Sequence, residues 1–324
     1  MLAPADGTVE TVLDGIEDNI IGQKNLEHNW GNTIVLQHGA GLYSKLSHLK
    51  QGSITVKPGD KIRKGDPVAQ CGNSGNSPYP HLHFQLQATP YIGSKTLRYP
   101  LSHLYLQRGG KRQMLEQAEP QTGDRVMNVQ PHPSLRAAFY LVNGQQFCWK
   151  DATHPEQLIR WEVAIDTYLN KYILCKATSS RAYFKVLDTM LYFTHFEGSR
   201  QSLLYRFYLA AHKISFGFER GMQLTDHIAL NRVYTARQLW LHDFVAPFFQ
   251  YLDAVYTVLY PNVQNERLIR DITLSGTVTT KRMGKTSTGQ QFTLQVDAEG
   301  LKAFTFLSPH HKTEAVCVKD PATC

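Results

Sequence analysis

The sequence predicts a mainly β protein that begins with an antiparallel β-sandwich domain and continues into a mixed β/α domain with long antiparallel strands. Short segments near the N-terminus alternate apolar and polar residues, as strands with one buried face do. Turn-forming pairs of glycine with aspartate or asparagine separate these segments. The length of 324 residues suits two domains, because a domain usually has about 100–200 residues.

The first domain is predicted to span residues 1–107 and to be all β. Its expected strands are residues 7–13, 32–37, 43–49 and 81–87. The phrases Pro58-Gly59-Asp60 and Gly65-Asp66 indicate tight turns, because glycine accepts a positive φ and aspartate bonds to the backbone. Residues 72–78, rich in glycine, asparagine and serine, are expected to form a loop before the last strand.

A polar segment, residues 108–124, is predicted to be the linker to a second domain over residues 125–324. A hairpin is expected over residues 137–149, because Asn143-Gly144 is a strong turn signal. A helix is expected within residues 235–260, broken at Pro247. Further strands are expected at residues 159–165, 172–175, 183–187, 191–195, 203–209, 292–296 and 303–307.

The composition excludes some classes of protein. A hydrophobic content of 42% is too high for a disordered chain. The net charge of +7 favours acidic partners, but no block of lysine and arginine occurs, so we expect a solvated basic surface and no nucleic acid partner. No segment reaches the ~18–20 apolar residues of a membrane span, so no transmembrane segment is expected. The first residues lack the basic start and apolar run of a signal peptide.

The five cysteines contain no C-x-x-C pair, so a cysteine zinc site is not expected. Cys317 and Cys324 close a short loop that would suit a disulfide. Cys148 and Cys175 either pair with each other or are simply buried. Cys71 precedes the glycine-rich loop and is predicted to be a small buried residue rather than a redox modulator.

The sequence His81-Leu82-His83 lies in a predicted strand, where residues i and i+2 project from the same face. Two imidazoles would then stand about 7 Å apart at the backbone. One of them could bind a metal while the other accepts or donates a proton. By itself the pattern also fits two ordinary surface histidines. The adjacent pair His310-His311 is expected to be a solvated turn, because neighbouring residues diverge in a strand.

The surroundings of this pair carry a resemblance to a known family. Residues 72–84 resemble the G-x-[ST]-G-x-[ST]-x-x-P-H-L-H-F signature of the lysostaphin/LytM-type zinc endopeptidases. Residues 31–49, which end in His48-Leu49, resemble the second block of that family, and residues 1–12 resemble the strand that follows its first metal motif. The resemblance covers about residues 1–105 and implies the duplicated-hybrid-motif fold of these peptidases.

The resemblance also implies roles for three histidines. His83 matches a zinc ligand of the family, and His81 and His48 match the two histidines that flank the zinc-bound water and the scissile carbonyl. It implies a zinc metalloendopeptidase that hydrolyses peptide bonds of bacterial cell-wall peptidoglycan, with one Zn²⁺ as cofactor and peptidoglycan peptides as partners. The expected location is the cell envelope, the periplasm or the exterior.

The sequence departs from this family at the metal site. The two other zinc ligands of the family come from an H-x-x-x-D motif, which does not occur in the first hundred residues. Asp6, Asp14, Asp18, His28 and His38 are available but lack that spacing. We expect His38 to be structural and His28 to be exposed. A chain with an incomplete start is the favoured explanation, and a genuine loss of the ligands is the second.

Two other functions compete with the peptidase. One is a degenerate, non-catalytic LytM-like domain that binds wall peptides or regulates another hydrolase. The other is a lipoyl- or biotinyl-type carrier domain, which needs a modifiable lysine at an exposed hairpin tip, and no such phrase occurs. The function of residues 125–324 stays open between substrate positioning, anchoring and inhibition, and so does the oligomeric state.

Overall fold

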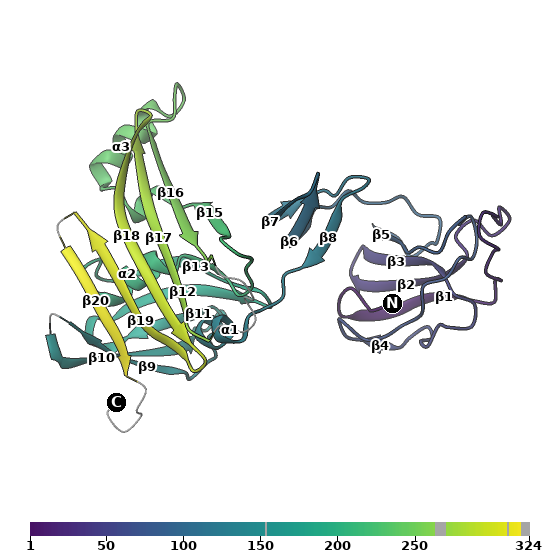
Figure 1. The fold of residues 1–324 in the computed structure, drawn as a ribbon, viewed down its shortest axis with the longest axis horizontal. Helices are drawn as coiled ribbons and strands as arrows, with labels where there is room; N and C mark the ends of the chain where they lie inside the picture. The colour runs from purple at the N-terminus through teal and green to yellow at the C-terminus, as the bar shows by residue number, and fades with distance from the viewer. Residues whose placement is uncertain (153, 263–269, 310, 319–324) are drawn as a thin grey trace. The chain divides into compact units, whose positions relative to one another are not determined.

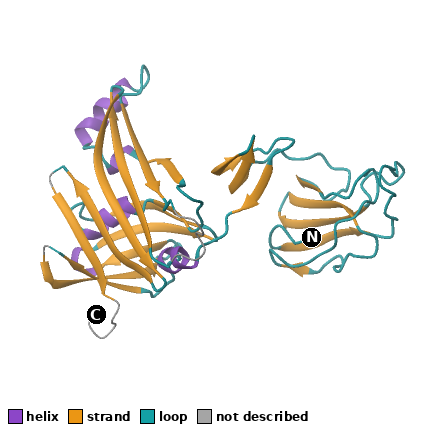
Figure 2. Cartoon of the chain, in the orientation of Figure 1, coloured by secondary structure: helices purple, strands orange, loops and turns teal. Residues whose placement is uncertain are grey.

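The computed structural model describes residues 1–152, 154–262, 270–309 and 311–318, and the chain divides into two compact units, residues 1–100 and 101–324. Both units are built mainly from antiparallel strands, as the sequence predicted (Figures 1 and 2). None of the helices in the described part of the chain combines the length and apolarity that crossing a bilayer requires.

The first unit contains a five-stranded antiparallel sheet with the strand order β4-β1-β2-β3-β5. Its strands are β1 (Gly7–Leu13), β2 (Asn32–Gly39), β3 (Leu42–Leu49), β4 (Lys61–Ile62) and β5 (His83–Gln87). The predicted strands are all present, with one difference. The strand expected from residue 81 begins at His83, because the His81 ring bonds to the backbone of the preceding loop.

The two faces of this sheet have opposite chemistry, because side chains alternate along each strand. One face, with Val9, Ile34, Leu36 and Leu46, forms the apolar core of the unit. The other face is polar and yet almost fully buried. It carries Thr33, Lys45, Ser47, Gln85 and Gln87, which are all at most 2% exposed. His83 lies on this polar face, opposite Ser47.

The predicted linker, residues 108–124, is largely a β-hairpin arm rather than a linker. Strands β6 (Leu101–Arg108), β7 (Lys111–Ala118) and β8 (Arg125–Asn128) form a three-stranded sheet in the order β7-β6-β8. Gly109 and Gly110 both have positive φ and make the tight turn between β6 and β7. The boundary between the units therefore lies near residue 100 rather than at residue 107.

The second unit is dominated by one twelve-stranded antiparallel sheet, with the order β14-β13-β12-β11-β10-β9-β20-β19-β18-β17-β16-β15. Pairing of β9 with β20 joins the early strands to the late ones. The strands are β9 (Gln146–Asp151), β10 (His154–Ile165), β11 (Lys171–Cys175), β12 (Ser180–Leu187), β13 (Met190–Glu197), β14 (Lys213–Ser215), β15 (Gln223–His227), β16 (Leu252–Leu259), β17 (Ile272–Arg282), β18 (Lys285–Asp297), β19 (Gly300–Ser308) and β20 (His311–Val318).

Three α-helices accompany this sheet in the described residues: α1 (Pro133–Phe139), α2 (Leu203–Ala210) and α3 (Ala236–Val245). The hairpin predicted over residues 137–149 was wrong in its first arm, which ends α1, although Gly144 does make the turn that leads into β9. The helix predicted within residues 235–260 is present only as α3, because the stretch after Pro247 continues as strand β16.

The strand predicted at residues 203–209 was also wrong, because this segment is α2. Ser202 caps the helix by accepting a hydrogen bond from the backbone N–H of Tyr205. All residues of α2 except Arg206 are buried, so the helix has no polar face whose spacing could reveal it in the sequence.

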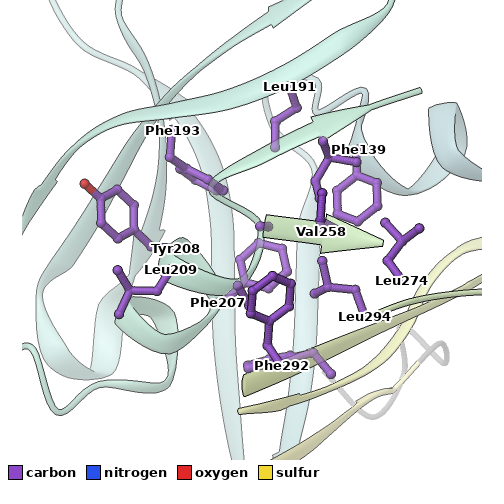
Figure 3. Close-up of a cluster of buried hydrophobic side chains, with 14 of the residues drawn as sticks. Phe139, Leu191, Phe193, Phe207, Tyr208, Leu209, Val258, Leu274, Phe292 and Leu294 are labelled. Atoms are coloured by element: carbon purple, nitrogen blue, oxygen red, sulfur yellow. The ribbon is translucent and has the colours of Figure 1, made fainter. Parts of the chain in front are cut away.

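Helix α2 forms the centre of the second core. It contacts β12 and β13 from one half of the large sheet and β17, β18 and β19 from the other. The ring of Phe207 lies 5.3 Å from that of Trp161 and 5.5 Å from that of Phe304, measured between ring centroids. Figure 3 shows Phe207, Phe193 and Phe292 within this apolar cluster. Burial of α2 between the two halves of the sheet therefore stabilises the whole second unit.

The cysteines differ in part from the expectation. Cys148 is disulfide-bonded and Cys175 is a free, buried thiol, so these two do not pair with each other. Cys71 is exposed, not buried, because the adjacent Gly72 takes the close approach to the backbone of Lys50. Cys317 is a thiol rather than half of a disulfide, so the disulfide predicted between Cys317 and Cys324 was wrong. His310 lies outside the described residues, so the turn at His310-His311 stays a prediction.

Replacing Phe207 with alanine is expected to destabilise the second unit by about 3–5 kcal/mol, because the lost ring leaves a cavity among four aromatic neighbours. Urea unfolding monitored by tryptophan fluorescence measures this change. Tyr168→Ala is the control, with an effect within about 0.5 kcal/mol, since Tyr168 is 84% exposed. Equal effects of the two substitutions would contradict this account of the core.

Candidate functional site

The three histidines singled out in the sequence gather at one end of the five-stranded sheet. The ring centroid of His48 lies 4.8 Å from that of His81 and 6.0 Å from that of His83. His48 is near the end of β3, His83 begins β5, and His81 ends the loop before it. Pairing of β3 with β5 brings the histidines together across 35 residues of sequence.

His48 is held in a fixed orientation by two backbone segments. Its Nδ1 donates to the carbonyl oxygen of Ser74 at 2.8 Å, and its backbone N–H donates to the carbonyl of Trp30 at 3.1 Å. With the proton on Nδ1, the Nε2 atom carries the lone pair. Burial lowers the pKa of His48 below 6.5, and the nearby charges of His81, His83 and Lys45 lower it further, so the ring is neutral at neutral pH.

His81 is exposed, and its Nδ1 is engaged in the same way. This atom donates to the carbonyl oxygen of Tyr79 at 2.8 Å and also lies 3.0 Å from the hydroxyl of Ser77. Ser77 in turn donates to the side-chain oxygen of Asn73. The Nε2 atom of His81 therefore also carries its lone pair away from the loop.

His83 presents the opposite nitrogen, because a chain of amides fixes its tautomer. Gln87 donates its Nε2 to the carbonyls of Thr89 and Tyr91, so its Oε1 accepts from Nε2 of Gln85 at 2.8 Å. The remaining Oε1 of Gln85 then accepts from Nε2 of His83 at 2.9 Å. Nδ1 of His83 is left unprotonated, which is the form that binds a metal.

Two further residues of the site were not found from the sequence. Lys45 places its Nζ 3.0 Å from the ring centroid of Trp30 and donates to the carbonyl of Ile92. Burial lowers the pKa of Lys45 to about 8. The Trp30 ring lies 4.9 Å from the ring of His83. Sequence alternation alone does not distinguish Lys45 from a solvent-facing residue of a half-buried strand. The period-2 spacing of Gln85 and Gln87 after His83, in contrast, is a signal that could have identified those two residues.

The glycine-rich loop, residues 72–78, can lie against the histidines only because the backbones of two glycines are in direct contact. Gly31 and Gly75 both have positive φ, and a Cβ on Gly75 would fall within 3.0 Å of the backbone of Gly31. A Cβ on Gly31 would in turn collide with the carbonyl of Ser74, the group that holds His48. Ser74 also bonds through its hydroxyl to the backbone of Asn32 and Leu49. These contacts set the position of the acceptor for His48.

The other acidic residues and histidines considered as ligands serve the fold instead. Asp14 and Asp18 accept backbone N–H groups of turns, and His38 bridges the carbonyl of Asp6 and the hydroxyl of Ser44. His28 is exposed, as expected. Within the described ranges, no group of three or more histidine, cysteine, aspartate or glutamate side chains could hold a metal ion.

A catalytic zinc normally has three protein ligands, so the described residues do not form a complete zinc site. His83 supplies one oriented donor nitrogen. The site that the structure shows is thus a cluster of three imidazoles with fixed tautomers, and the part of the chain that the structure describes does not supply the remaining donors that a zinc ion would require.

Comparison with known proteins supports the assignment of the first unit. The model of Peptidase family M23 matches residues 1–94. An uncharacterized metalloprotease of Buchnera aphidicola is 36% identical over 78 residues, which are 24% of this chain and 20% of that protein. The peptidoglycan DD-endopeptidase ShyA of Vibrio cholerae is 39% identical over 90 residues, 26% of this chain and 20% of that protein. The resemblance of the N-terminal region to the LytM-type peptidases is confirmed.

The matched region is a small part of each relative, since the chain covers about a fifth of their length. Among solved structures, a mutant catalytic domain of the prophage-encoded M23 protein EnpA from Enterococcus faecalis is 22% identical. That match covers 30% of this chain and 64% of the other, with a TM-score of 0.24.

Gly75→Ala is expected to destabilise the first unit by at least about 2 kcal/mol, because alanine would suffer both the left-handed φ and the collision with Gly31. Thermal or urea unfolding of the first unit measures the change. Gly52→Ala is the matched control, since Gly52 has a similar φ of 66° but no atom within 4 Å of an added Cβ. A cost no larger than that of the control would refute the close approach.

The pKa of His48 is expected to lie below 6.5 in an NMR titration, and to rise in His81→Ala and in Lys45→Met, because the charged forms of His81 and Lys45 both lower it. The native state then binds fewer protons than the unfolded state near pH 6.5. The free energy of unfolding therefore falls as the pH drops from 6.5 towards the pKa of the native state. A titration of His48 at or above 6.5 in the unmodified protein is the contrary result.

Proposed function

We propose that the first unit acts on peptides of bacterial cell-wall peptidoglycan as a metalloendopeptidase of the M23 type. In this proposal His48 and His81 transfer protons and His83 binds the metal. The observation that carries this proposal is the set of fixed tautomers. His83 offers Nδ1, and His48 and His81 each offer Nε2, within one cluster of rings.

The two Nε2 atoms suit proton transfer. A neutral imidazole whose Nδ1–H is bound to a carbonyl has an unprotonated Nε2, which can take a proton from water. Burial keeps His48 in this neutral form, so we assign it the part of proton acceptor. His81 is exposed, where water can solvate its protonated form, so we assign it the delivery of a proton to the leaving amine.

His83 is the residue of this chain that we assign to Zn²⁺ binding, through Nδ1. When bound, zinc in such a site polarises the scissile carbonyl. Because the described residues lack the other donors, binding of one Zn²⁺ depends on ligands beyond them, such as an H-x-x-x-D motif. Peptide cross-links as substrate, and the cell envelope, periplasm or exterior as location, are part of the same proposal.

The second candidate is a non-catalytic domain that binds wall peptides or regulates another hydrolase. The incomplete donor set among the described residues favours it. The cluster of His48, His81 and His83 would then contact a peptide without cutting it. Zinc content and cleavage distinguish the two candidates, because only the first requires both.

The test uses the product of the whole reading frame, purified and measured for bound zinc and for peptides released from peptidoglycan. His83→Ala is expected to lose zinc and activity together. His81→Ala is expected to keep zinc and to lose activity by at least about 100-fold. His28→Ala, an exposed loop histidine, is the control that changes neither.

Cleavage that persists without zinc, or that survives His81→Ala, would rule out the proposed peptidase. Binding of wall peptides by a protein that holds no zinc and releases no fragments would establish the second candidate instead.

A further inference from the structure

Five large apolar side chains lie at one end of the second unit and are exposed to solvent. They are Trp240, Phe244, Phe248, Phe249 and Met283, and they are between 48% and 83% exposed. We call this group the aromatic tip. Contiguous exposed apolar surface is uncommon on a soluble protein and marks a surface that something else covers.

Three segments build the aromatic tip. Trp240 and Phe244 lie one turn apart on α3, with ring centroids 6.1 Å apart and planes inclined by 12°. Phe248 and Phe249 follow in the turn after α3. Met283 comes from the turn between β17 and β18, and its backbone N–H donates to the carbonyl of Tyr251 at 2.9 Å. Figure 1 shows α3 beside this end of β17 and β18.

The exposure of these rings follows from the way in which the helix is anchored. Leu239, Leu241 and Val245 of α3 are partly buried and pack against the large core, so the helix already has a face that contacts the fold. Thr235 and Gln238 form a capping box that secures its start. The tip aromatics therefore point outward from an anchored helix, and the fold does not use them for its own core.

The charges around the aromatic tip are mostly positive. Arg237, Arg282 and Lys285 are exposed and form no ion pair with a described residue, although Arg282 donates its Nε–H to the hydroxyl of Tyr251 at 2.6 Å. Lys281 is paired with Asp253 at 3.5 Å. Asp243 is the exposed carboxylate on α3. The surface thus combines aromatic side chains and a methionine with a surplus of cations.

We propose that the aromatic tip inserts into the headgroup region of an anionic phospholipid bilayer and so anchors the protein to a membrane surface. Tryptophan and phenylalanine favour the boundary between headgroups and acyl chains, while arginine and lysine pair with lipid phosphates. The positive charge favours an anionic lipid surface over an apolar protein groove, because such a groove would supply no negative charge to these cations.

The experiment measures binding of the whole chain to vesicles of phosphatidylglycerol and phosphatidylcholine, with vesicles of phosphatidylcholine alone for comparison. The fluorescence of Trp240 reports insertion directly, without an added label. Trp149 and Trp161 are at most 1% exposed, so a blue shift of the emission, or quenching by brominated acyl chains, comes from an exposed indole. Trp240→Phe, which keeps an aromatic ring, shows whether that indole is Trp240 or Trp30.

The double substitution Phe244→Ser and Phe248→Ser keeps Trp240 and is expected to weaken vesicle binding by at least about tenfold. The control is Tyr168→Ser with Leu169→Ser, two side chains that are 84% and 82% exposed on another turn. Arg237→Gln with Lys285→Gln is expected to weaken binding only to the phosphatidylglycerol vesicles and to reduce its dependence on salt. Thermal unfolding checks that each variant is folded.

Three results would overturn the proposal. The first is no binding to either kind of vesicle. The second is binding that the tip substitutions leave unchanged while the Tyr168 and Leu169 substitutions abolish it. The third is self-association of the chain in solution that the tip substitutions remove, because a second copy would then be what covers the surface.

Discussion

The contact between Gly31 and Gly75 is the constraint on which the candidate site depends. It allows two backbone segments to approach more closely than any side chain would permit. The carbonyl of Ser74 is thereby placed where it can accept the Nδ1 proton of His48, at 2.8 Å. The backbone of Trp30, next to Gly31, holds the N–H of the same histidine. One close approach thus decides both the position and the tautomer of His48.

The polar face of the five-stranded sheet extends this control to the other side of the site. Buried polar groups are costly unless each has a partner, and here the amides of Gln85 and Gln87 satisfy one another and the adjacent loop carbonyls. The end of that chain of hydrogen bonds orients His83. Lys45 is desolvated on the same face, and its lowered pKa follows from that burial. The face is therefore rigid and polar, unlike the apolar face that forms the core.

The second unit depends on a different interaction, the burial of the apolar surface of its large sheet. A twelve-stranded sheet exposes much apolar surface, and α2 covers it from within by contacting both halves of the sheet. That arrangement leaves α3 at the periphery, with one side packed on the core and the other side carrying the aromatic tip. The unit thus has a large core of its own and a separate exposed surface available for a partner.

The sequence by itself predicted every strand of the first unit except β4, the resemblance of that unit to the LytM-type peptidases and the three candidate histidines. These follow from short-range patterns, namely period-2 alternation, glycine turns and the residues around His81-Leu82-His83. It did not reveal α2, because a helix buried on nearly all sides lacks the polar face that gives helical periodicity. Nor did it show that residues 111–118 form a strand, since an exposed hairpin has the same composition as a linker.

Only the tertiary structure decided which nitrogen each histidine presents and that Lys45 and Trp30 border them. Those facts arise from contacts between segments far apart in the chain, such as Lys45 with Ile92 and His48 with Ser74. The aromatic tip belongs to the same class. Its residues come from α3, from the turn after it and from a turn about 35 residues further along the chain, and no local pattern distinguishes an exposed phenylalanine from a buried one.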